Sequence, residues 1–188
     1  MKTKYLEFKY AKSPTGNDWY YVKRTNDTNT HDSAVAITTL VKINNNYNFL
    51  FIKTKRPPIY GENKAKYCLE SPAGLIGDID KNEKLIDCAK KELLEETGYV
   101  ANAMYIELTN SSTSGGLTSE TLSYITAIVD SDEVVKAPLS DGGIIAERFF
   151  VPADKVLSYI KAADKSELSI SSTAICGIYF ALERIKGF

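Results

Sequence analysis

The sequence contains very little histidine and cysteine. Its one histidine, His31, cannot supply a multi-histidine metal site. The three cysteines are widely spaced and odd in number, which indicates reduced, mostly buried thiols rather than a disulfide framework or a zinc cluster. Any metal would therefore be held by oxygen ligands, which suit magnesium, manganese or calcium.

An excess of charge of one sign is also missing. The 23 Lys and Arg residues nearly balance 24 Asp and Glu residues, so a broad electrostatic interaction with nucleic acid is not expected. The apolar runs are far too short to span a membrane, and the first ten residues contain no apolar signal-peptide core. We therefore expect a cytoplasmic protein that binds neither membrane nor nucleic acid.

The length and composition fit one folded domain. The chain has 188 residues, of which 44% are hydrophobic and 25% charged, enough for a sizeable core. Strands outnumber helices before residue 152, so a mixed α/β or α+β domain is predicted. Strands are expected at residues 4–9, 19–24, 34–43, 48–54, 66–71, 101–109, 121–130 and 145–151. Helices are expected at residues 83–97, from Pro152 onward, and at about 170–186.

The helix predicted at 83–97 carries an unusual concentration of acidic residues. A helical wheel places its buried stripe at Leu85, Ile86, Ala89 and Leu93. Glu92 and Glu96 border this stripe, and Glu95 lies further round the helix. A carboxylate removed from water without a partner costs several kcal/mol, so the arrangement needs an explanation.

Two interpretations of these glutamates are open from the helix alone. Their oxygens could hold a divalent cation such as Mg²⁺, together with waters and substrate phosphates. Alternatively, they form a solvated acidic surface with Lys90 and Lys91 nearby as counter-charges.

Residues 77–99, GDIDKNEKLIDCAKKELLEETGY, resemble the Nudix hydrolase signature. In that signature G, five residues, E, seven residues and R-E-U-x-E-E-x-G-U follow one another, with U apolar. The matching residues are Gly77, Glu83, Glu92, Leu93, Glu95, Glu96 and Gly98. Lys91 stands where the signature has Arg, which keeps the charge but loses the planar fork. We expect Glu83 to orient Lys91 rather than to bind metal.

Other segments are similar to one branch of that family, the ADP-ribose pyrophosphatases. They are PAGL at 72–75, Trp19 followed by VKRT at 22–25, KRPP at 55–58 and GGLTSE at 115–120. In this branch the signature glycine is often the one in PAG, so Gly74 and Gly77 are both candidates for that role.

The resemblance implies a Nudix fold, an α/β/α sandwich around a mixed β-sheet. An N-terminal strand hairpin over residues 1–33 would precede the Nudix domain at 34–188. In ADP-ribose pyrophosphatases this hairpin helps to build a dimer, so a homodimer is expected, with the hairpin also contributing to base binding.

The resemblance also implies a site for Mg²⁺ or Mn²⁺. Glu92 and Glu96 are the expected primary ligands, and Glu95 is a further ligand or the base that activates water. The backbone carbonyl of Ala73 is expected to complete the protein's contribution. Metal ions neutralise the concentrated charge of a diphosphate and help to ionise the attacking water.

Substrate-binding residues are expected upstream of the signature. Trp19 resembles the residue that stacks on adenine, although it could equally be a packed hairpin aromatic. Arg24 and Arg56 resemble phosphate or ribose contacts, where a guanidinium pairs two-pronged with phosphate oxygens, rather than solvated surface arginines. Glu70 is either a hydrogen-bond partner of base or ribose, or an ordinary strand residue.

One departure from the branch concerns the catalytic base. Many ADP-ribose pyrophosphatases carry a water-activating Glu in a late loop, which here is 139–152, and the expected position falls near Gly143 or Ile144. Neither residue can act as a base. Glu147 is the candidate that we carry as catalytic, with Asp141, Glu120 and the glutamates of the helix as alternatives.

The function that we expect is metal-dependent hydrolysis of a nucleoside diphosphate linked to a sugar, with ADP-ribose giving AMP and ribose 5-phosphate. Another nucleotide sugar such as UDP-glucose is a second possibility. A catalytically weak nucleotide-binding sensor is a third.

Overall fold

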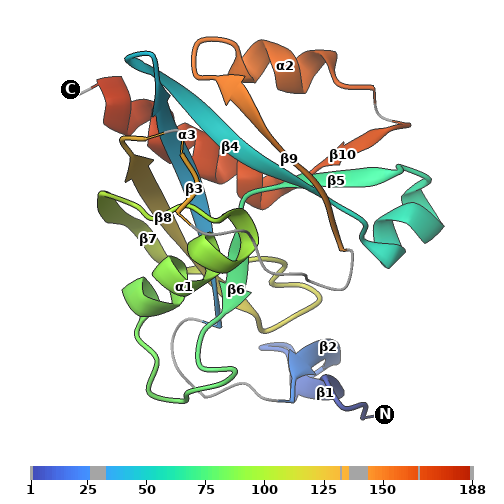
Figure 1. The fold of residues 1–188 in the computed structure, drawn as a ribbon. Coiled ribbons are helices and arrows are strands. Elements are labelled where there is room, and N and C mark those ends of the chain that lie inside the picture. Colours follow the sequence, from blue (N-terminus) through green and yellow to red (C-terminus); the bar gives the residue numbers. More distant parts are fainter. Residues whose placement is uncertain (1, 26–32, 132, 136–143, 165, 187–188) are drawn as a thin grey trace.

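An eight-stranded mixed β-sheet carries helices on both sides in the computed structural model (Figure 1). The structure describes residues 2–25, 33–131, 133–135, 144–164 and 166–186. The sheet contains β3 (Ala34–Ile43), β4 (Asn46–Thr54), β5 (Tyr67–Glu70), β6 (Ala73–Leu75), β7 (Ala103–Ser112), β8 (Thr121–Val129), β9 (Ile145–Pro152) and β10 (Leu168–Ile170). The helices are α1 (Leu85–Thr97), α2 (Val156–Ala162), α3 (Ser172–Lys186) and a short π-helical turn, η1 (Ile59–Asn63).

Strand β3 lies at the centre of this sheet. It runs parallel to β8 and antiparallel to β4 and β6, and the main path of the sheet is β10-β5-β4-β3-β8-β7. A two-residue turn joins β3 to β4, with Asn44 and Asn45 at φ values of 49° and 67°. Asparagine tolerates this left-handed conformation, which matches the twist of a tight hairpin. Most of β3 is buried because helices cover both sides of the sheet.

Two hydrophobic cores lie on the two sides of the sheet. On one side α1 packs Cys88, Ala89 and Leu93 against residues of β3, β4 and β8. On the other side α2 and α3 cover a core that includes Phe49 and Phe51. The expected α/β/α sandwich around a mixed sheet is therefore confirmed.

Helix α1 has the amphipathic form that the sequence predicted. Leu93 is fully buried, whereas Glu92 and Glu96 are half-buried at the border of the apolar stripe. The helix ends at Gly98, whose φ is +81° and whose N–H donates to the carbonyl of Leu94 at 2.9 Å. Glycine adopts this left-handed conformation without the steric penalty of a Cβ, so the chain turns sharply there.

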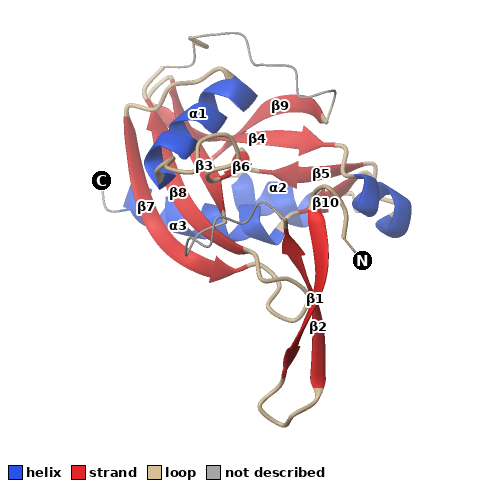
Figure 2. Cartoon of the chain, turned by 90° about the horizontal axis from the view of Figure 1, so that it is seen from below, coloured by secondary structure: helices blue, strands red, loops and turns tan. Residues whose placement is uncertain are grey.

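The N-terminal segment forms a separate two-stranded sheet. Strands β1 (Leu6–Lys12) and β2 (Asp18–Arg24) pair antiparallel, and Figure 2 shows that they project from the body of the molecule. Backbone hydrogen bonds from Val22 to Leu117 (2.8 Å) and from Ser119 to Val22 (3.2 Å) attach β2 to the loop between β7 and β8.

Several predicted boundaries were wrong. Residues 73–75 and 168–170, not recognised as strands, form β6 and β10, whose hydrogen-bond partners lie far away in the sequence. The predicted helix from Pro152 begins only at Val156, because pairing with Asn48 extends β9 as far as Pro152. Strand β7 continues to Ser112 through two register shifts, into a segment predicted to be loop.

The cysteines behave as the sequence predicted. All three lie in the described parts of the chain and none forms a disulfide. Cys68 and Cys88 are buried, and burial raises the pKa of each thiol to about 12, whereas Cys176 is exposed. The helices in the described parts of the chain are all too short or too polar to span a membrane.

Candidate functional site

Two glutamates of α1 lie beside the start of β6. The backbone N–H of Ala73 donates to Oε2 of Glu96 at 3.0 Å. A Cβ added to Gly74 would overlap the Cγ and Cδ atoms of Glu92, so this backbone lies directly against that side chain. Glu95 is half-buried on the same helix. Strand β6 and helix α1 therefore bring together Ala73, Glu92 and Glu96, three of the expected metal-binding residues.

Burial disfavours the ionised form of both glutamates. Burial raises the pKa of Glu96 to about 7, a hydrogen bond from Ala73 lowers it, and the charge of Glu92 raises it. Burial also raises the pKa of Glu92, while Lys91 acts in the opposite direction. A cation placed between two such carboxylates would stabilise their ionised forms. The electrostatics of the pair therefore favour cation binding.

An ion pair between Lys91 and Glu83 stabilises the loop before α1. Nζ of Lys91 lies 2.9 Å from Oε1 of Glu83 and 3.4 Å from Oε1 of Glu92, so Glu83 does pair with Lys91. Burial opposes the ionisation of Glu83, but the ion pair with Lys91 and a hydrogen bond from the N–H of Gly77 outweigh it and lower its pKa. Gly77 has a φ of +74°, which directs its N–H to Glu83 at 3.1 Å. The two candidate glycines thus have different roles, since Gly74 approaches Glu92.

Arg56, which follows β4, and Glu70, at the end of β5, both lie near Glu96. Nη2 of Arg56 lies 2.9 Å from Oε2 of Glu70, which also accepts a hydrogen bond from Oγ1 of Thr54 at 2.7 Å. After burial, which dominates, the charge of Arg56 lowers the pKa of Glu96 and that of Glu70 raises it. Both side chains are therefore close enough to act on this carboxylate.

Arg148 of β9 holds the end of α1. Its Nε donates to the backbone carbonyl of Glu96. Carbonyls in the last turn of a helix have no partner within the helix, so a side-chain donor there stabilises the helix terminus. Arg148 thereby positions the turn that carries Glu96.

The donor set fits a hard divalent cation bound together with a substrate. No three His, Cys, Asp or Glu side chains in the described ranges are gathered as a complete metal site. Glu92 and Glu96 offer two carboxylates, and Mg²⁺ typically uses one or two carboxylates with waters and substrate phosphates. The observed contact of Ala73 uses its N–H, while its carbonyl oxygen is a further hard donor on the same strand.

Trp19 and Arg24 belong to a different cluster, between the hairpin and the loop before β8. Nε1 of Trp19 donates to the carbonyl of Gly116 at 3.1 Å, and the residue is 52% exposed. Nε of Arg24 donates to Oε2 of Glu120. In the described parts of the chain these contacts join the hairpin to this loop and not to α1.

Glu147 is not brought to the α1 glutamates. Its Oε2 accepts a hydrogen bond from Nζ of Lys53 at 2.7 Å, and that Nζ also lies 4.8 Å from the centre of the Phe149 ring. Neighbouring residues of a strand point to opposite sides of the sheet. Because Arg148 contacts α1, Glu147 lies on the side covered by α2 and α3.

The other candidates for the catalytic base also differ in whether they lie near the α1 glutamates. Glu120 is paired with Arg24 beside the hairpin. Asp141 and Gly143 lie outside the described residues. Glu95, by contrast, shares α1 with the two half-buried glutamates and has no ion pair or hydrogen bond through its side chain within the described ranges.

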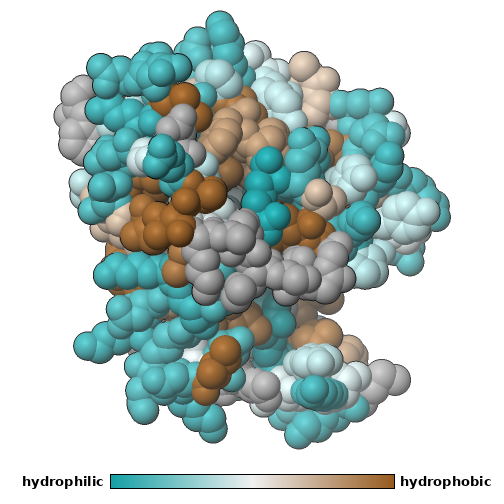
Figure 3. Space-filling model, in the orientation of Figure 1, coloured by the Kyte–Doolittle hydropathy of each residue, from teal (hydrophilic) through white to brown (hydrophobic). Residues whose placement is uncertain are grey.

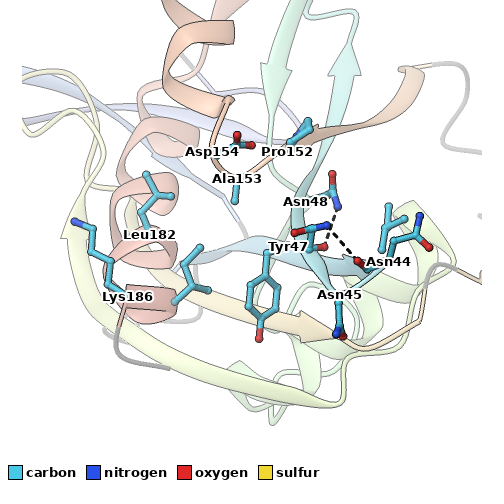
Figure 4. Close-up of a pocket in the computed structure, with 12 residues that line it drawn as sticks. Asn44, Asn45, Tyr47, Asn48, Pro152, Ala153, Asp154, Leu182 and Lys186 are labelled. Carbon is cyan, nitrogen blue, oxygen red and sulfur yellow. Dashed lines mark hydrogen bonds between the residues drawn. The ribbon is translucent and has the colours of Figure 1, made fainter.

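A cavity of about 840 Å³ lies at the other end of the sheet (Figure 4). It is formed by the β3–β4 turn, the segment after β9 and the end of α3. The side-chain amides of Asn46 and Asn48 donate to the carbonyls of Asn44 and Asn46 at 3.1 and 3.0 Å, so they stabilise the turn. The cavity is about 23 Å from the glutamates, judged by the length of β3 between them.

Comparison with curated proteins reveals a relative whose sequence aligns with nearly the whole chain. An uncharacterized Nudix hydrolase of Schizosaccharomyces pombe is 32% identical over 175 residues, which span 89% of this chain and 80% of the relative. The chain belongs to the Nudix hydrolase family. This Nudix hydrolase is also 28% identical over 188 residues to a Caenorhabditis elegans protein named nudix hydrolase 2, covering 96% and 80% of the two chains. No family model matches the chain.

Solved structures confirm the Nudix fold. A crystal structure of an ADP compounds hydrolase aligns with a TM-score of 0.62 at 17% identity, over 97% of this chain and 86% of that one. The NUDIX domain of Shewanella oneidensis NrtR, solved with ADP ribose, aligns with a TM-score of 0.56 at 18% identity, over 81% and 86% of the two chains.

Sequence reasoning missed two polar residues that support the site of this Nudix hydrolase. Thr54 orients Glu70, and Arg148 holds the end of α1. Thr54 directly precedes the KRPP segment, so its nearness to the site could have been suspected. In the sequence Arg148 is only a charged residue between Glu147 and Phe149 in a predicted strand. Its partner, the carbonyl of Glu96, lies 52 positions away, so no local pattern indicated the contact.

Proposed function

We propose that this Nudix hydrolase cleaves the diphosphate of a nucleoside diphosphate linked to a sugar, with ADP-ribose giving AMP and ribose 5-phosphate. The observation that carries the proposal is the half-buried pair Glu92 and Glu96, held against β6, with Arg56 close by. The two carboxyl groups, whose ionised forms need a nearby cation, suit a divalent metal ion. The guanidinium beside them suits the negatively charged diphosphate that the metal would bind. The fold neighbours titled as an ADP compounds hydrolase and as an ADP ribose complex support this substrate class.

The cofactor would be Mg²⁺ or Mn²⁺. Glu92 and Glu96 would hold it, with the carbonyl of Ala73 as a further donor. When bound, the ion would neutralise phosphoryl oxygens and lower the pKa of a water molecule that attacks phosphorus.

The protein's own side chains would position the substrate and the site. Arg56 would pair with a phosphate, and Glu70 holds its guanidinium in place at 2.9 Å. Lys91 fixes Glu92 from the other side at 3.4 Å. Glu95 would accept the proton of the attacking water, because it lies on the same helix as the metal-binding pair.

The hairpin would bind the base and build a homodimer. Trp19 presents a half-exposed ring on which adenine could stack, and Arg24 lies at the other end of the same strand, β2. Within one chain these two side chains contact the loop 113–120 and not α1. They would therefore reach a substrate bound at the α1 of a second chain. We propose a homodimer for this reason.

The metal assignment is tested with Glu96→Gln. Turnover of ADP-ribose should fall more than about 100-fold, because metal stabilisation is worth several kcal/mol and each roughly 1.4 kcal/mol is tenfold. Circular dichroism should show an intact fold. Glu183→Gln, which changes an exposed glutamate of α3, serves as the matched control and should keep full turnover. Equal rates for both variants would exclude the assignment.

The substrate is tested by incubating the protein with Mg²⁺ and a panel of ADP-ribose, UDP-glucose, NADH and diadenosine polyphosphates. Phosphate-containing products are separated by anion-exchange chromatography. Production of AMP and ribose 5-phosphate supports the proposal, and a preference for UDP-glucose replaces it with the second nucleotide sugar. Tight binding of ADP-ribose without products would indicate a sensor.

A further inference from the structure

A pocket of about 420 Å³ lies beside η1 and shares Arg56 with the glutamate site described above. Its lining residues are Lys55, Arg56, Pro57, Tyr60, Lys66 and Tyr67. They come from the segment between β4 and β5, which includes η1, and from Tyr67 at the start of β5. A volume in this range is typical of small-molecule sites.

The lining of this pocket is strongly basic. It contains three cations and no acidic side chain. Glu70 pairs with Arg56 at 2.9 Å, whereas Glu167 lies 3.6 Å from Lys66 in an exposed pair that contributes little. The ammonium of Lys55 has no ion pair within the described ranges. The pocket therefore retains positive charge that an anion could neutralise.

Two aromatic rings accompany these cations. Tyr60 is 65% exposed, and its hydroxyl has no hydrogen bond among the described residues, so its ring is accessible. Tyr67 is half-buried, with Nζ of Lys66 at 5.5 Å from its ring centre. Planar bases stack on such rings, and ammonium groups bind phosphate oxygens.

Backbone hydrogen bonds hold the walls of the pocket in place. The N–H of Lys55 donates to Ile144 at 2.8 Å, and the N–H of Tyr67 donates to Glu167 at 3.0 Å. Within the turn, the N–H of Tyr60 donates to the carbonyl of Arg56 at 3.0 Å. Walls fixed in this way reduce the entropy lost when a ligand binds.

We propose that this pocket binds a nucleoside monophosphate group, its phosphate on Lys55 and Lys66 and its base on Tyr60. Arg56 connects the pocket to the α1 glutamates, because it lines the pocket and also acts on the charge of Glu96. Building on the proposed function, the pocket receives the second nucleotide of a substrate in which a diphosphate joins two nucleosides. Such a substrate gains a stacking contact that a terminal sugar cannot make.

Binding is tested without catalysis by moving the single tryptophan into the pocket. In a Trp19→Phe, Tyr60→Trp protein the only indole reports on this site, and titration with AMP should quench its fluorescence to saturation. Adding Lys55→Ala and Lys66→Ala should weaken the apparent affinity at least about fivefold, and adding Glu96→Gln should leave it unchanged. Absence of saturable quenching, or equal affinity without the lysines, overturns the proposal.

Substrate selection is tested by the ratio of kcat/KM for NADH to that for ADP-ribose. Tyr60→Ala should lower this ratio roughly 5- to 100-fold, the range expected for loss of one stacked base. Tyr179→Ala removes an equally exposed tyrosine on α3 and should leave the ratio as it is. An unchanged ratio in Tyr60→Ala overturns the role in substrate selection. If the protein hydrolyses neither compound, the proposed function fails and the fluorescence titration still decides the pocket.

Discussion

At the scale of single residues, the backbone of Gly74 determines how closely β6 approaches Glu92. A Cβ at this position would overlap the end of the glutamate side chain. In Gly74→Ala the flexible side chain would move aside, so the fold should survive at a cost of about 1 kcal/mol while the carboxylate leaves its place. We expect turnover of ADP-ribose, measured in the presence of Mg²⁺, to fall at least about tenfold.

Gly61→Ala is the matched control for this prediction. A Cβ at Gly61 would have no atom within 4 Å, so the change adds a methyl group to open space. Its turnover and unfolding midpoint should equal those of the unchanged protein. Wild-type turnover in Gly74→Ala would show that the position of Glu92 does not depend on this close approach.

The sequence predicted these site residues only where they lie close together along the chain. Glu92 and Glu96 are one helical turn apart, so their shared position at the edge of the stripe follows from helix geometry. The partners of Arg148 and Glu147 lie 52 and 94 positions away, and only the sheet brings them together. The register of β9 on β4 decides which of these two side chains meets α1, and a single sequence does not specify that register.

At the scale of elements, a partly buried ion pair joins the edge strand β7 to α3. Nε and Nη2 of Arg184 lie 2.5 and 2.9 Å from the two carboxylate oxygens of Glu107, and the guanidinium lies 3.9 Å from the ring centre of Tyr105. The two charged side chains are 25% and 11% exposed. Removing one partner would leave a largely buried, unpaired charge, which is strongly destabilising.

Arg184→Met should therefore lower the free energy of unfolding by about 2–4 kcal/mol at neutral pH, measured by urea denaturation. Burial opposes the ionisation of Glu107, but the hydrogen bonds and the charge of Arg184 outweigh it and lower its pKa below 4.5. The stability that the ionised carboxylate contributes is thus present above pH 4.5 and is lost as the pH falls through the lowered pKa. The difference between the two proteins should shrink in that acidic range.

Lys186→Met tests whether this effect belongs to the pair of Arg184 and Glu107. Lys186 is on the same helix and pairs with Glu183 at 2.6 Å in an exposed position, which is worth less than about 1 kcal/mol. A loss in this variant as large as in Arg184→Met, or a difference that does not change with pH, would contradict the prediction.

Elements with a strong local pattern could be predicted, and short ones could not. Strands β3 and β4 carry long apolar runs around a turn of asparagines, and α1 has both periodicity and a terminal glycine. Strands β6 and β10 have three residues each, too few for any periodicity, and exist because β3 and β5 offer free edges to pair with. The turn η1 followed two prolines, so its residues read as a loop.

At the scale of the whole molecule, the hairpin presents aromatic side chains that the body of the chain does not cover. Phe8, Tyr10 and Tyr20 share one side of the hairpin and are 54%, 64% and 55% exposed. Phe8 and Tyr20 stack with their ring centres 5.7 Å apart. The surface seen in Figure 3, by contrast, is mostly hydrophilic, with hydrophobic residues in separate patches.

An exposed group of aromatic residues on a projecting hairpin is typical of an interface with another chain. A second copy of this chain is the partner that fits the homodimer proposed above, because each hairpin could then bring Trp19 to the other copy's α1. Light scattering should give twice the mass of one chain, and a Phe8→Lys, Tyr20→Lys protein should give the mass of one. Tyr179→Lys, on exposed α3, should remain dimeric. A monomeric unchanged protein that still hydrolyses ADP-ribose would remove the hairpin from both assembly and base binding, leaving a site built by one chain.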